Sequence, residues 1–467
     1  MNAFDIIKTM NEKIYDFKIT LPKNVSEIIH TLNNAGYEAY AVGGCIRDSI
    51  LNRDPNDWDI TTSAKPEIIK GLFRRTVDTG IEHGTVTVMV GNESFEVTTY
   101  RTDGEYLDSR HPSSVEFVTN LKEDLRRRDF TINAMAYNEE DGLMDPFNGY
   151  GDLKLKVIRC VGNPQDRLSE DALRILRAVR FSAQLSFEIE KNTQNAIALL
   201  APTLKNISVE RICTELLKLI TSDHPEYIRN AYELGITRVF LPEFDRMMTT
   251  EQNSKYHIYS VGEHTIKTMQ NIEAVKLLRL TMLLHDIGKP EAKTTDEFGQ
   301  DHFEGHAIIG LDIAKNIMRR LKLDNETIRN VLLLIRYHDW RFPAEIKNVR
   351  KAVCRIGEDM FPNFIKVQTA DALSKGDYKK EETLARIKKL GELYEIIIKE
   401  NQCTTLKTMA IKGKDIIAMG YKPGPLIGVI LNDALTEVIE HPENNNVEYL
   451  TEYIKRKGES YESKGTI

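Results

Sequence analysis

Cysteine is scarce in this chain of 467 residues, and its few cysteines stand far apart. The five are Cys45, Cys160, Cys213, Cys354 and Cys403. No two have the spacing of a CxxC pair, which excludes a local thiol motif for metal binding or redox chemistry. Isolated cysteines of this kind usually serve as small core residues, and we expect that role here.

Long hydrophobic runs and an excess of positive charge are also missing. The apolar stretches fall far short of the roughly 18 residues that a membrane span needs. Residues 1–14 carry charges where a signal peptide has an apolar core. We therefore expect a cytoplasmic protein with no membrane partner. The net charge of −7 argues against non-specific coating of nucleic acid but leaves room for a local basic groove.

The chain has enough apolar material for several folded domains. Hydrophobic residues make up 41% and charged residues 28%, and the length corresponds to about three domains. Strand patterns at residues 37–42, 85–90, 95–100 and 115–118 occur among short helices, and helical spacing dominates from about residue 165. The predicted fold class is α+β, with a small mixed sheet followed by helical domains.

A glycine pair follows the first predicted strand. Gly43 and Gly44 separate that strand from a helix predicted at residues 46–51. The missing Cβ atoms let a phosphate approach the backbone, and Arg47, in the first turn of the helix, could pair with a phosphate oxygen. A Gly-Gly turn alone is equally typical of an ordinary left-handed turn.

Two aspartates, Asp57 and Asp59, stand two residues apart at the start of a predicted strand, so both point to one face. Mg²⁺ typically takes one or two carboxylates together with substrate phosphates, and metals held in this way support in-line phosphoryl displacement. Alone, this pattern is also typical of a solvated turn, but the upstream glycines and Arg47 favour a metal site. Glu96, on a later strand, either is a third ligand or faces solvent.

In this order, the motifs resemble the polymerase-β-like nucleotidyltransferase head of the bacterial class II tRNA nucleotidyltransferases. These CCA-adding enzymes share a superfamily with the bacterial poly(A) polymerases. Residues 126–134 (RRRDFTINA) resemble the family's RRDFTxNA motif, and residues 169–181 (SEDALRILRAVRF) resemble its EDxxRxxRAxRF motif. The resemblance covers residues 35–240. It implies template-independent addition or repair of the tRNA 3′-terminal CCA from CTP and ATP, with Mg²⁺ in the head.

The first of these motifs places a run of three arginines, ending in Arg128, before Asp129 and Asn133. Asp129 and Asn133 are four residues apart, so they share one face of any helix that begins there. The resemblance implies that Arg128, Asp129 and Asn133 contact the triphosphate and ribose of the incoming nucleotide. Read alone, the arginine run is typical of a solvated surface.

The second motif holds an acceptor and a donor three residues apart. On a helix, Asp171 and Arg174 share a face, where they could accept from the amine and donate to the ring nitrogen that cytosine and adenine present. Each good base contact discriminates by about 1–3 kcal/mol. Read alone, the pair could instead be an intrahelical ion pair worth roughly a few tenths of a kcal/mol. We expect Arg177 and Arg180 to orient the pair or touch the triphosphate.

The polar segment 101–112 (RTDGEYLDSRHP) is predicted to be a mobile loop. By resemblance, it is the flexible loop that complete CCA-adding and A-adding enzymes keep and that CC-adding relatives shorten. Residues 80–86 (GIEHGTV) and the acidic composition resemble the CCA-adding enzymes more than the bacterial poly(A) polymerases. The alternatives are an A-adding tRNA nucleotidyltransferase, a poly(A) polymerase, or a tRNA-binding protein whose only chemistry lies further along the chain.

Histidines gather in the second half of the chain. The ordered series His264, His285-Asp286, His306, His338 and Asp371 resembles the HD metal-dependent phosphohydrolase superfamily. The resemblance implies that the metal ligands are His264, His285, Asp286 and Asp371. His306 and His338 are available for a second ion. Imidazole and carboxylate suit transition metals such as Mn, Ni or Co. Such a site could hydrolyse a phosphoester at an RNA 3′ end, although some superfamily members use the fold only structurally.

We predict four segments. Residues 1–150 form the nucleotidyltransferase head and residues 151–250 a helical neck for nucleotide selection and RNA binding. Residues 251–390 form the HD domain and residues 391–467 a helical tail. Residues 411–425 of the tail resemble the C-terminal tRNA-contacting element of class II enzymes. The expected partners are tRNA, CTP and ATP, and the sequence implies no stable protein partner.

Overall fold

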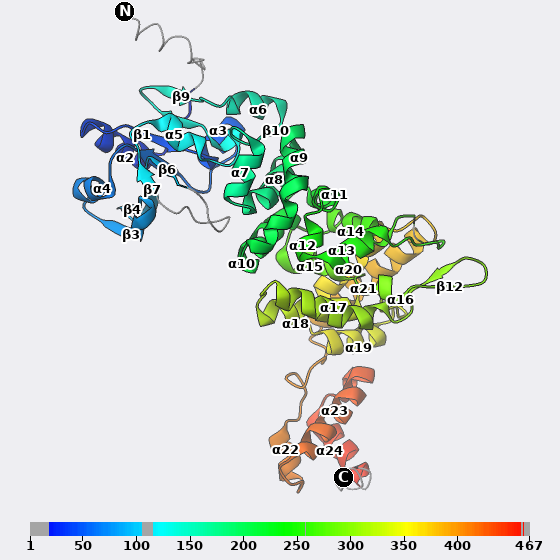
Figure 1. Ribbon diagram of the computed structural model, residues 1–467. Helices are drawn as coiled ribbons and strands as arrows, with labels where there is room; N and C mark the ends of the chain where they lie inside the picture. Colours follow the sequence, from blue (N-terminus) through cyan, green and yellow to red (C-terminus); the bar gives the residue numbers. More distant parts are fainter. Residues whose placement is uncertain (1–17, 105–114, 257, 459–460, 462–467) are drawn as a thin grey trace, which may run out of the picture. The chain divides into compact units, whose positions relative to one another are not determined.

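The chain forms two compact units in a computed structural model that describes residues 18–104, 115–256, 258–458 and 461. The units are Met1–Asp245 and Arg246–Ile467, and Figure 1 traces both along the chain. Across the described ranges, none of the helices combines the length and the apolar character needed to cross a membrane.

A seven-stranded mixed sheet forms the first half of the first unit. Its order is β3-β4-β5-β2-β1-β8-β9, and only the β2–β5 pair is parallel. The strands are β1 (Ala39–Val42), β2 (Asp59–Thr62), β3 (Thr76–Gly80), β4 (Thr85–Val90), β5 (Glu93–Thr99), β8 (Ala136–Asn138) and β9 (Gly142–Met144). Val42, at the end of the buried strand β1, pairs with Asp59 and Ala136. This register brings the turn after β1 beside the start of β2.

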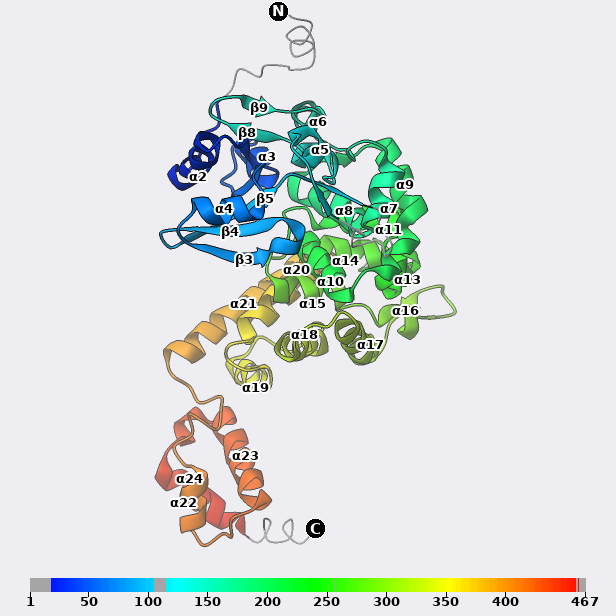
Figure 2. The same ribbon diagram turned by 60° about the vertical axis from the view of Figure 1, so that its left-hand side comes forward.

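Short helices flank this sheet (Figure 2). They are α2 (Lys23–Asn34), α3 (Gly44–Ile50), α4 (Pro66–Leu72), α5 (Leu121–Arg126) and the 3₁₀ turns η1 (Ile81–His83) and η2 (Thr131–Asn133). Helix α2 buries Val25, Ile28, Ile29 and Leu32, the spacing of one helical face. Through that face α2 packs on β1 and β2, while α4 covers β4 and β5.

The segment predicted as a mobile loop begins instead as a strand. β6 (Arg101–Asp103) pairs antiparallel with β7 (Val115–Phe117), and Arg101 lies opposite Phe117. The prediction was therefore wrong for residues 101–103, where backbone pairing overrides the polar composition. Its residues 105–112 lie outside the described residues.

The second half of the first unit is helical. Its elements are α6 (Gly149–Leu155), β10 (Val157–Ile158), α7 (Pro164–Glu170), α8 (Leu173–Leu185), β11 (Glu188–Ile189), α9 (Lys191–Leu200), η3 (Ala201–Asn206), α10 (Val209–Ile220), η4 (Pro225–Tyr227), α11 (Ile228–Glu233), α12 (Thr237–Phe240) and α13 (Pro242–Thr249), the last of which contains the unit boundary. The helix predicted over residues 169–181 is interrupted. Asp171 is extended, and its carboxylate accepts a hydrogen bond from the Leu173 N–H at 3.0 Å, which satisfies a free donor at the start of α8.

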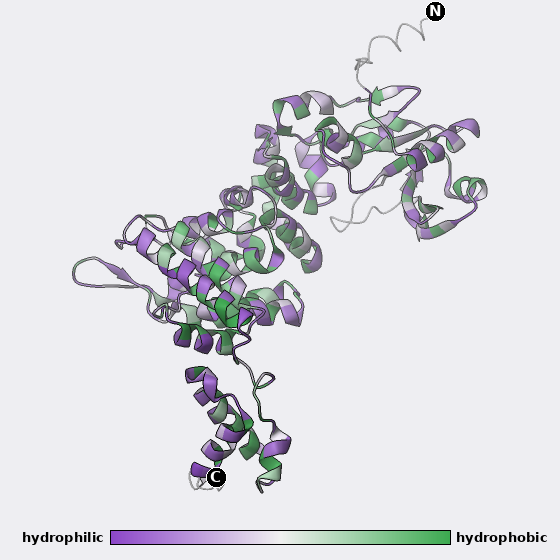
Figure 3. Cartoon of the chain, turned by 180° about the vertical axis from the view of Figure 1, so that it is seen from behind, coloured by the Kyte–Doolittle hydropathy of each residue, from purple (hydrophilic) through white to green (hydrophobic). Residues whose placement is uncertain are grey.

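The second unit is almost entirely helical. Its elements are α14 (Val261–Gln270), α15 (Lys276–Leu284), α16 (Lys289–Ala292), β12 (Thr294–Thr295), β13 (Asp301–His302), α17 (His306–Arg320), α18 (Asn325–Tyr337), α19 (Ile346–Ile356), α20 (Phe361–Leu373), α21 (Lys380–Lys399), α22 (Gly413–Ala418), α23 (Pro425–Glu440), η5 (Pro442–Asn444) and α24 (Val447–Arg456). Green and purple alternate around many of these helices in Figure 3, as amphipathic packing requires. The C-terminal helices α22–α24 share a core that includes Ile416, Ile430, Val438 and Leu450.

Candidate functional sites

An open cavity of about 440 Å³ lies in the first unit. Every residue predicted to bind nucleotide lines it, and so does Asp59. The predicted residues are Gly43, Gly44, Arg47, Arg128, Asp129, Asn133, Asp171, Arg174, Arg177 and Arg180. Seven arginines and three aspartates line the cavity in all, so its wall suits a polyanion. Arg127, Phe181 and Arg211 also line it and were not predicted.

Gly43 allows a close approach that other residues would obstruct. Its φ of 86° is in the left-handed region, and a Cβ placed on it would lie 3.0 Å from Nη1 of Arg128. Glycine therefore serves both the turn after β1 and the position of an arginine from a distant segment. The turn brings Arg128 to the end of β1.

A chain of hydrogen bonds links Arg47 to Asp129. Nη1 of Arg47 donates to Oδ1 of Asn133 at 2.6 Å, and Nδ2 of Asn133 donates to Oδ1 of Asp129 at 3.0 Å. Asp129 and Asn133 were predicted to share one helix face, and their side chains do make a contact. It arises from the 3₁₀ turn η2, however, and not from a helix that begins at Asp129. Phe130 is extended and interrupts the helical path.

Asp129 also accepts a charge-assisted hydrogen bond from Arg177, with Nε at 2.8 Å from Oδ2. Burial by itself would raise the pKa of Asp129, but Arg177 and the Asn133 hydrogen bond outweigh it and hold the pKa well below the ordinary range. Asp129 therefore stays ionised at any pH near neutrality. It presents a fixed acceptor at the cavity wall.

A buried carboxylate absent from the sequence predictions anchors the arginine run. Asp124, on α5, is fully buried and lies 2.9 Å from Nη2 of Arg127 and 3.6 Å from Nη2 of Arg128. Its Oδ2 accepts from the Thr61 hydroxyl on β2 at 3.1 Å. Burial opposes ionisation, yet the two arginines lower the pKa of Asp124. Asp124 thus fixes Arg127 and Arg128 against the sheet. The alternative interpretation of the arginine run, a solvated surface, does not hold for these two residues.

Asp171 and Arg174 both line the cavity, but each has its own ion-pair partner. Asp171 lies at the break between α7 and α8, where its Oδ2 is 2.8 Å from Nη2 of Arg211 on α10. Arg174 Nη1 is 2.5 Å from Oε2 of Glu170, and its Nη2 donates to the carbonyl of Arg127 at 2.9 Å. The alternative of an intrahelical Asp171–Arg174 ion pair is therefore wrong. Asp171 is extended and precedes the helix that carries Arg174, and each side chain pairs with a different residue.

Phe181 supports the arginines of α8 from one side. The guanidinium of Arg180 lies 3.8 Å from the ring centroid, that of Arg47 5.1 Å and that of Arg177 5.3 Å. Arg180 also pairs with the buried Glu215 of α10 at 2.5 Å. Cation–π contact favours positive charge at a desolvated ring, so this cluster keeps three guanidiniums together at the cavity.

The predicted metal-binding carboxylates lie around a second cavity of about 730 Å³. Asp57, Asp59 and Glu96 all line it. β2 begins at Asp59, so Asp57 lies just outside the strand that was predicted to include it. Dense protein around the Asp59 carboxylate raises its pKa, Arg128 opposes the rise, and Glu96 and Asp57 add to it. Asp57 and Glu96 thus lie close enough to oppose ionisation of Asp59, and carboxylate oxygens are the ligands that Mg²⁺ prefers.

In the second unit, two close sets of donor atoms share one aspartate. His264, His285 and Asp286 form one set, and Asp286, His306 and His338 form the other; within each set the donor atoms lie within 4.8 Å of one another. Asp286 follows the end of α15, and the histidines come from α14, α15, α17 and α18 or their ends. The fold therefore brings together residues separated by up to 74 positions of sequence.

The two oxygens of Asp286 face different histidine pairs. Oδ2 lies 3.2 Å from Nε2 of His285 and 3.6 Å from Nε2 of His264. Oδ1 lies 3.4 Å from Nε2 of His306 and 3.6 Å from Nε2 of His338. One carboxylate thus lies between two pairs of imidazoles, the arrangement of a bridging ligand.

The other ring nitrogen of each histidine faces a backbone carbonyl. The Nδ1 distances are 2.7 Å to Met282 O from His285, 2.7 Å to Ile335 O from His338, 2.8 Å to Phe303 O from His306 and 3.3 Å to Ser374 O from His264. A carbonyl only accepts, so Nδ1 carries a proton, and Nε2 is the ring nitrogen that faces the cluster and offers a lone pair when the ring is neutral. This donor set fits transition-metal ions.

Asp371, also predicted as a ligand, lies at the edge of the cluster. Its Oδ1 is 3.0 Å from Nε2 of His264 and 3.9 Å from Nε2 of His285, and its Oδ2 pairs with Lys375. Sequence reasoning missed Lys289, a buried lysine whose Nζ is 2.8 Å from Asp286 Oδ2. Burial opposes ionisation of Asp286, but His285 and Lys289 hold its pKa well below the ordinary range.

Family models of polymerase and tRNA nucleotidyltransferase domains match parts of both units. The family model described as poly A polymerase head domain matches residues 39–159, and that described as probable RNA and SrmB-binding site of polymerase A matches residues 186–248. The model described as tRNA nucleotidyltransferase domain 2 matches residues 308–454. The matches follow the order of the motifs along the chain.

Curated relatives extend over most of the chain. The CCA-adding enzyme of Levilactobacillus brevis is 36% identical over 88% of this chain and 92% of its own length. That of Enterococcus faecalis is 34% identical over 93% of this chain and 96% of its own length. The crystal structure of the Bacillus stearothermophilus CCA-adding enzyme in complex with CTP superposes with a TM-score of 0.69 at 27% identity, covering 94% of this chain and 98% of that one. Similarity of this extent establishes the family, and the chain belongs to the CCA-adding enzymes, which are tRNA nucleotidyltransferases.

Proposed function

We propose that this protein adds or repairs the 3′-terminal CCA of tRNA without a nucleic-acid template, using CTP and ATP. The observation that carries the proposal is the arginine-rich cavity, because every residue predicted to bind nucleotide lines it. The relatives are named CCA-adding enzymes, and the Bacillus stearothermophilus structure was solved with CTP. The names of the relatives and the CTP complex both support the proposal that this cavity binds a nucleotide.

Base selection is assigned to Asp171 and Arg174. Cytosine and adenine each present an exocyclic amine beside a ring-nitrogen acceptor, whereas guanine and uracil present an N–H and a carbonyl. A carboxylate accepts from the amine and a guanidinium donates to the ring nitrogen. One pair of side chains therefore admits both C and A, and no template is needed.

The rest of the nucleotide is assigned to the cavity wall. Arg128 and Arg47, held by Asp124 and Asn133, carry positive charge toward a triphosphate. Asp129 stays ionised and offers acceptor oxygens to ribose hydroxyls. Because these groups are fixed by contacts within the protein, a bound nucleotide is positioned with little rearrangement.

The transfer step needs positioning more than covalent chemistry. The 3′-hydroxyl of tRNA attacks the α-phosphate of CTP or ATP, a P–O bond forms, and pyrophosphate leaves. Divalent metal use is typical of this family, and Asp57, Asp59 and Glu96 are the residues that would hold Mg²⁺. When bound, Mg²⁺ neutralises charge that develops on the phosphate oxygens. The same proposal assigns the head to residues 1–150, the neck to 151–250, the HD domain to 251–390 and the tail to 391–467, working on tRNA in the cytoplasm.

Sequencing of reaction products tests the main function. Purified protein is incubated with tRNA that lacks its 3′ end, Mg²⁺ and each nucleoside triphosphate alone or together. CTP alone should give two added C residues, and CTP with ATP should give CCA. Addition of A only to tRNA that already ends in CC would identify an A-adding enzyme, and long A tracts would identify a poly(A) polymerase.

We propose a second activity at the histidine cluster, the hydrolysis of a phosphoester at an RNA 3′ end, such as a 2′,3′-cyclic phosphate. The observation that favours it is the carboxylate of Asp286 between two imidazole pairs whose tautomers are fixed by backbone carbonyls. A transition metal such as Mn, Ni or Co would be held there and would polarise the phosphoryl group. In this hydrolysis, the oxygen of water forms a bond to phosphorus. The bond between phosphorus and one ribose oxygen breaks, and that ribose oxygen takes a proton from the water.

Metal analysis and phosphoester turnover test the second activity. Native protein should contain a bound transition ion and should open a 2′,3′-cyclic phosphate when Mn, Ni or Co is supplied. If no ion is bound and no phosphoester turns over with any of the three, the domain is a scaffold. It would then serve to position the tRNA acceptor arm.

A further inference from the structure

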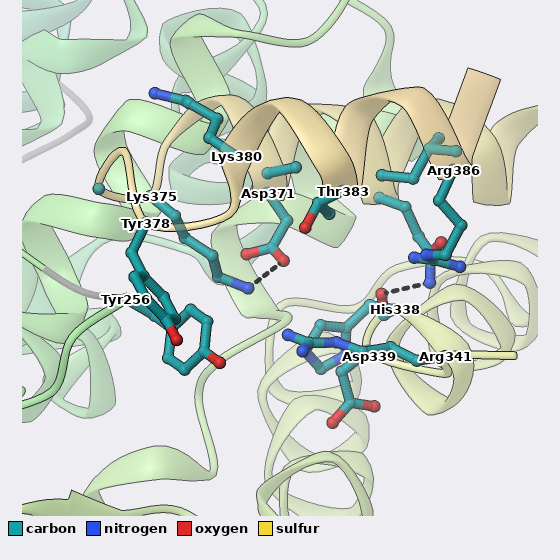
Figure 4. Close-up of a pocket in the computed structure, with 14 residues that line it drawn as sticks. Tyr256, His338, Asp339, Arg341, Asp371, Lys375, Tyr378, Lys380, Thr383 and Arg386 are labelled. Atoms are coloured by element: carbon teal, nitrogen blue, oxygen red, sulfur yellow. Dashed lines mark hydrogen bonds and ion pairs between the residues drawn. The ribbon is translucent and has the colours of Figure 1, made fainter.

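A small pocket of about 40 Å³ adjoins the histidine cluster (Figure 4). His338 and Asp371 line it, so the pocket reaches the cluster itself. Its other walls come from the segment after α18, from the residues after α20, from the start of α21 and from Tyr256. In Figure 4 the Asp371 carboxylate points into the space between these walls.

Two arginines in this pocket have no carboxylate partner among the residues that the structure describes. Arg341 and Arg386 both line it, and across the described ranges neither has a carboxylate within ion-pair distance. Arg386 Nη1 donates only a long hydrogen bond, 3.4 Å, to the carbonyl of Phe342. Burial, and then repulsion from Arg341, lower the pKa of Arg386. Two neighbouring cations that repel one another in this way suit an anionic ligand.

Two tyrosines stand at the mouth of the same pocket. Tyr256 and Tyr378 line it and meet edge to face, with ring centroids 5.0 Å apart at 75°. They are 38% and 47% exposed, so their rings remain available to a ligand. Exposed aromatic rings beside cationic side chains are the common platform for a nucleobase next to its phosphate.

The size of the pocket limits what its interior can hold. A volume of about 40 Å³ suits a single phosphate-sized group and leaves no room for a triphosphate or a nucleoside. The phosphate would therefore enter toward His338 and Asp371, and the attached nucleoside would stay at the tyrosines. This arrangement differs from the wide head cavity of about 440 Å³.

We propose that this pocket is the recognition subsite for a nucleotide that carries one terminal phosphate ester. Arg341 and Arg386 bind the phosphate, and Tyr256 and Tyr378 stack on the base. The inference rests on the proposed phosphohydrolase function, because the pocket shares its inner wall with the histidine cluster. It adds the substrate class and the residues that select it. The ligand chemistry is shared by a free nucleoside 3′-monophosphate and an RNA that ends in a 3′-phosphate.

Binding measured without turnover tests the subsite. The full chain is titrated by calorimetry, in the presence of EDTA and again with Mn²⁺, with adenosine 3′-monophosphate, adenosine or inorganic phosphate. The 3′-monophosphate should bind at least about tenfold more tightly than adenosine. A trinucleotide that ends in a 3′-phosphate, compared with the same trinucleotide ending in a hydroxyl, separates an RNA end from a free nucleotide. Absence of any preference for the 3′-phosphate in either pair would overturn the proposal.

Variants separate the phosphate contact from the base contact. The double variant Arg341→Gln with Arg386→Gln should weaken binding of both adenosine 3′-monophosphate and inorganic phosphate about tenfold. Tyr378→Ala should weaken the nucleotide about tenfold and leave inorganic phosphate unchanged, and Tyr378→Phe should restore the nucleotide. Lys389→Gln, an exposed change further along α21, is the matched control and should change neither. Transition-metal content and far-UV circular dichroism, measured in every variant, report that the second unit is folded.

Turnover then distinguishes this inference from the function on which it rests. Tight nucleotide binding without hydrolysis would contradict the proposed phosphohydrolase activity and would still support the proposed subsite. Hydrolysis of both 2′,3′-cyclic AMP and bis(p-nitrophenyl) phosphate, each unchanged by the arginine and tyrosine substitutions, would overturn the subsite and leave the phosphohydrolase standing.

Discussion

The head cavity and the histidine cluster handle charge in opposite ways. The head cavity is wide and lined by seven arginines, each paired with a carboxylate. Three of them, Arg177, Arg180 and Arg211, pair with a carboxylate from a distant segment. The histidine cluster is buried and narrow, and its four imidazoles surround one carboxylate. The first arrangement suits a large polyanion that enters and leaves. The second suits small cations held in place by uncharged rings.

The difference shows how each site stays stable when nothing is bound. In the head, ion pairs such as Arg177–Asp129 at 2.7 Å balance the arginines internally. In the cluster, the proton on each Nδ1 is held by a backbone carbonyl, and Lys289 offsets the charge of Asp286. The two sites share no residue, so each should be removable without the other. The predictions below test this independence.

The largest effect is expected at the head carboxylates. Asp57→Ala or Asp59→Ala should reduce incorporation of both C and A by about a hundredfold or more, because the charge that holds the divalent ion is lost. Binding of tRNA should survive in filter-binding assays, and phosphoester hydrolysis by the second unit should be unchanged. Near-normal incorporation in either variant would contradict the assignment of Asp57 and Asp59 as Mg²⁺ ligands.

At the cluster, substitutions should change the number of bound ions by different amounts. Asp286 belongs to both donor sets, whereas His306 belongs to one. Asp286→Asn should therefore abolish transition-metal binding, and His306→Ala should lower the number of bound ions by one, as measured by mass spectrometry of metal content. The paired change His285→Ala with Asp286→Ala should stop phosphoester hydrolysis and leave CCA addition within about twofold. A matching loss of CCA addition would show that the sites are coupled.

An intermediate effect is expected where the base is read. Arg174→Ala should relax selection of C and A over U and G by about tenfold, beyond any loss of rate. Arg211→Ala should relax it less, because Arg211 acts on the base only through the carboxylate of Asp171. Arg211→Lys keeps the charge and is the control. Kinetics with all four triphosphates measure discrimination, and a variant that is slower with unchanged selectivity would show that the pair is only structural.

The smallest effect concerns a thiol beside the head site. Burial raises the pKa of Cys45 to about 12, and Asp59 adds to the rise. A raised thiol pKa means that the reactive thiolate is absent below that pH, with a fraction of about one in ten thousand at pH 8. Iodoacetamide at pH 8 should therefore leave Cys45 unlabelled in the native protein and label it after unfolding in guanidinium. Rapid labelling of native Cys45, located by peptide mass mapping, would contradict the packing around β1.

Sequence reasoning succeeded where the chemistry lies in contiguous motifs. Gly43, Arg47, Asp129 and Asn133 line one cavity as their motif order suggested, and the histidine series converges as its order suggested. Short motifs fix the local backbone, so residues within them keep their relation after folding. Pattern reading also gave the strand at Thr85–Val90 without error.

It failed where a contact depends on a distant partner. Arg211 holds Asp171 in place from 40 residues away, so no local spacing marks it. Asp124, in contrast, lies three and four residues before Arg127 and Arg128, a local spacing that the sequence reasoning overlooked. The helix predicted through Asp171 was wrong because a side-chain cap on Leu173 overrides helical periodicity. Strand β3 went unnoticed because it is polar and mostly exposed, so only its pairing with β4 identifies it.

The ion pair between Asp171 and Arg211 would compete with the base for the carboxylate that we propose to select it. Before any nucleotide arrives, the oxygens of Asp171 already face a guanidinium at 2.8 and 3.4 Å. An incoming base must therefore offer an amine good enough to share or displace that guanidinium. A carbonyl in the same place would meet only repulsion from Asp171, which would stay with Arg211. Under the proposed role of Asp171, the strength of its ion pair with Arg211 sets how stringently the cavity selects its nucleotide.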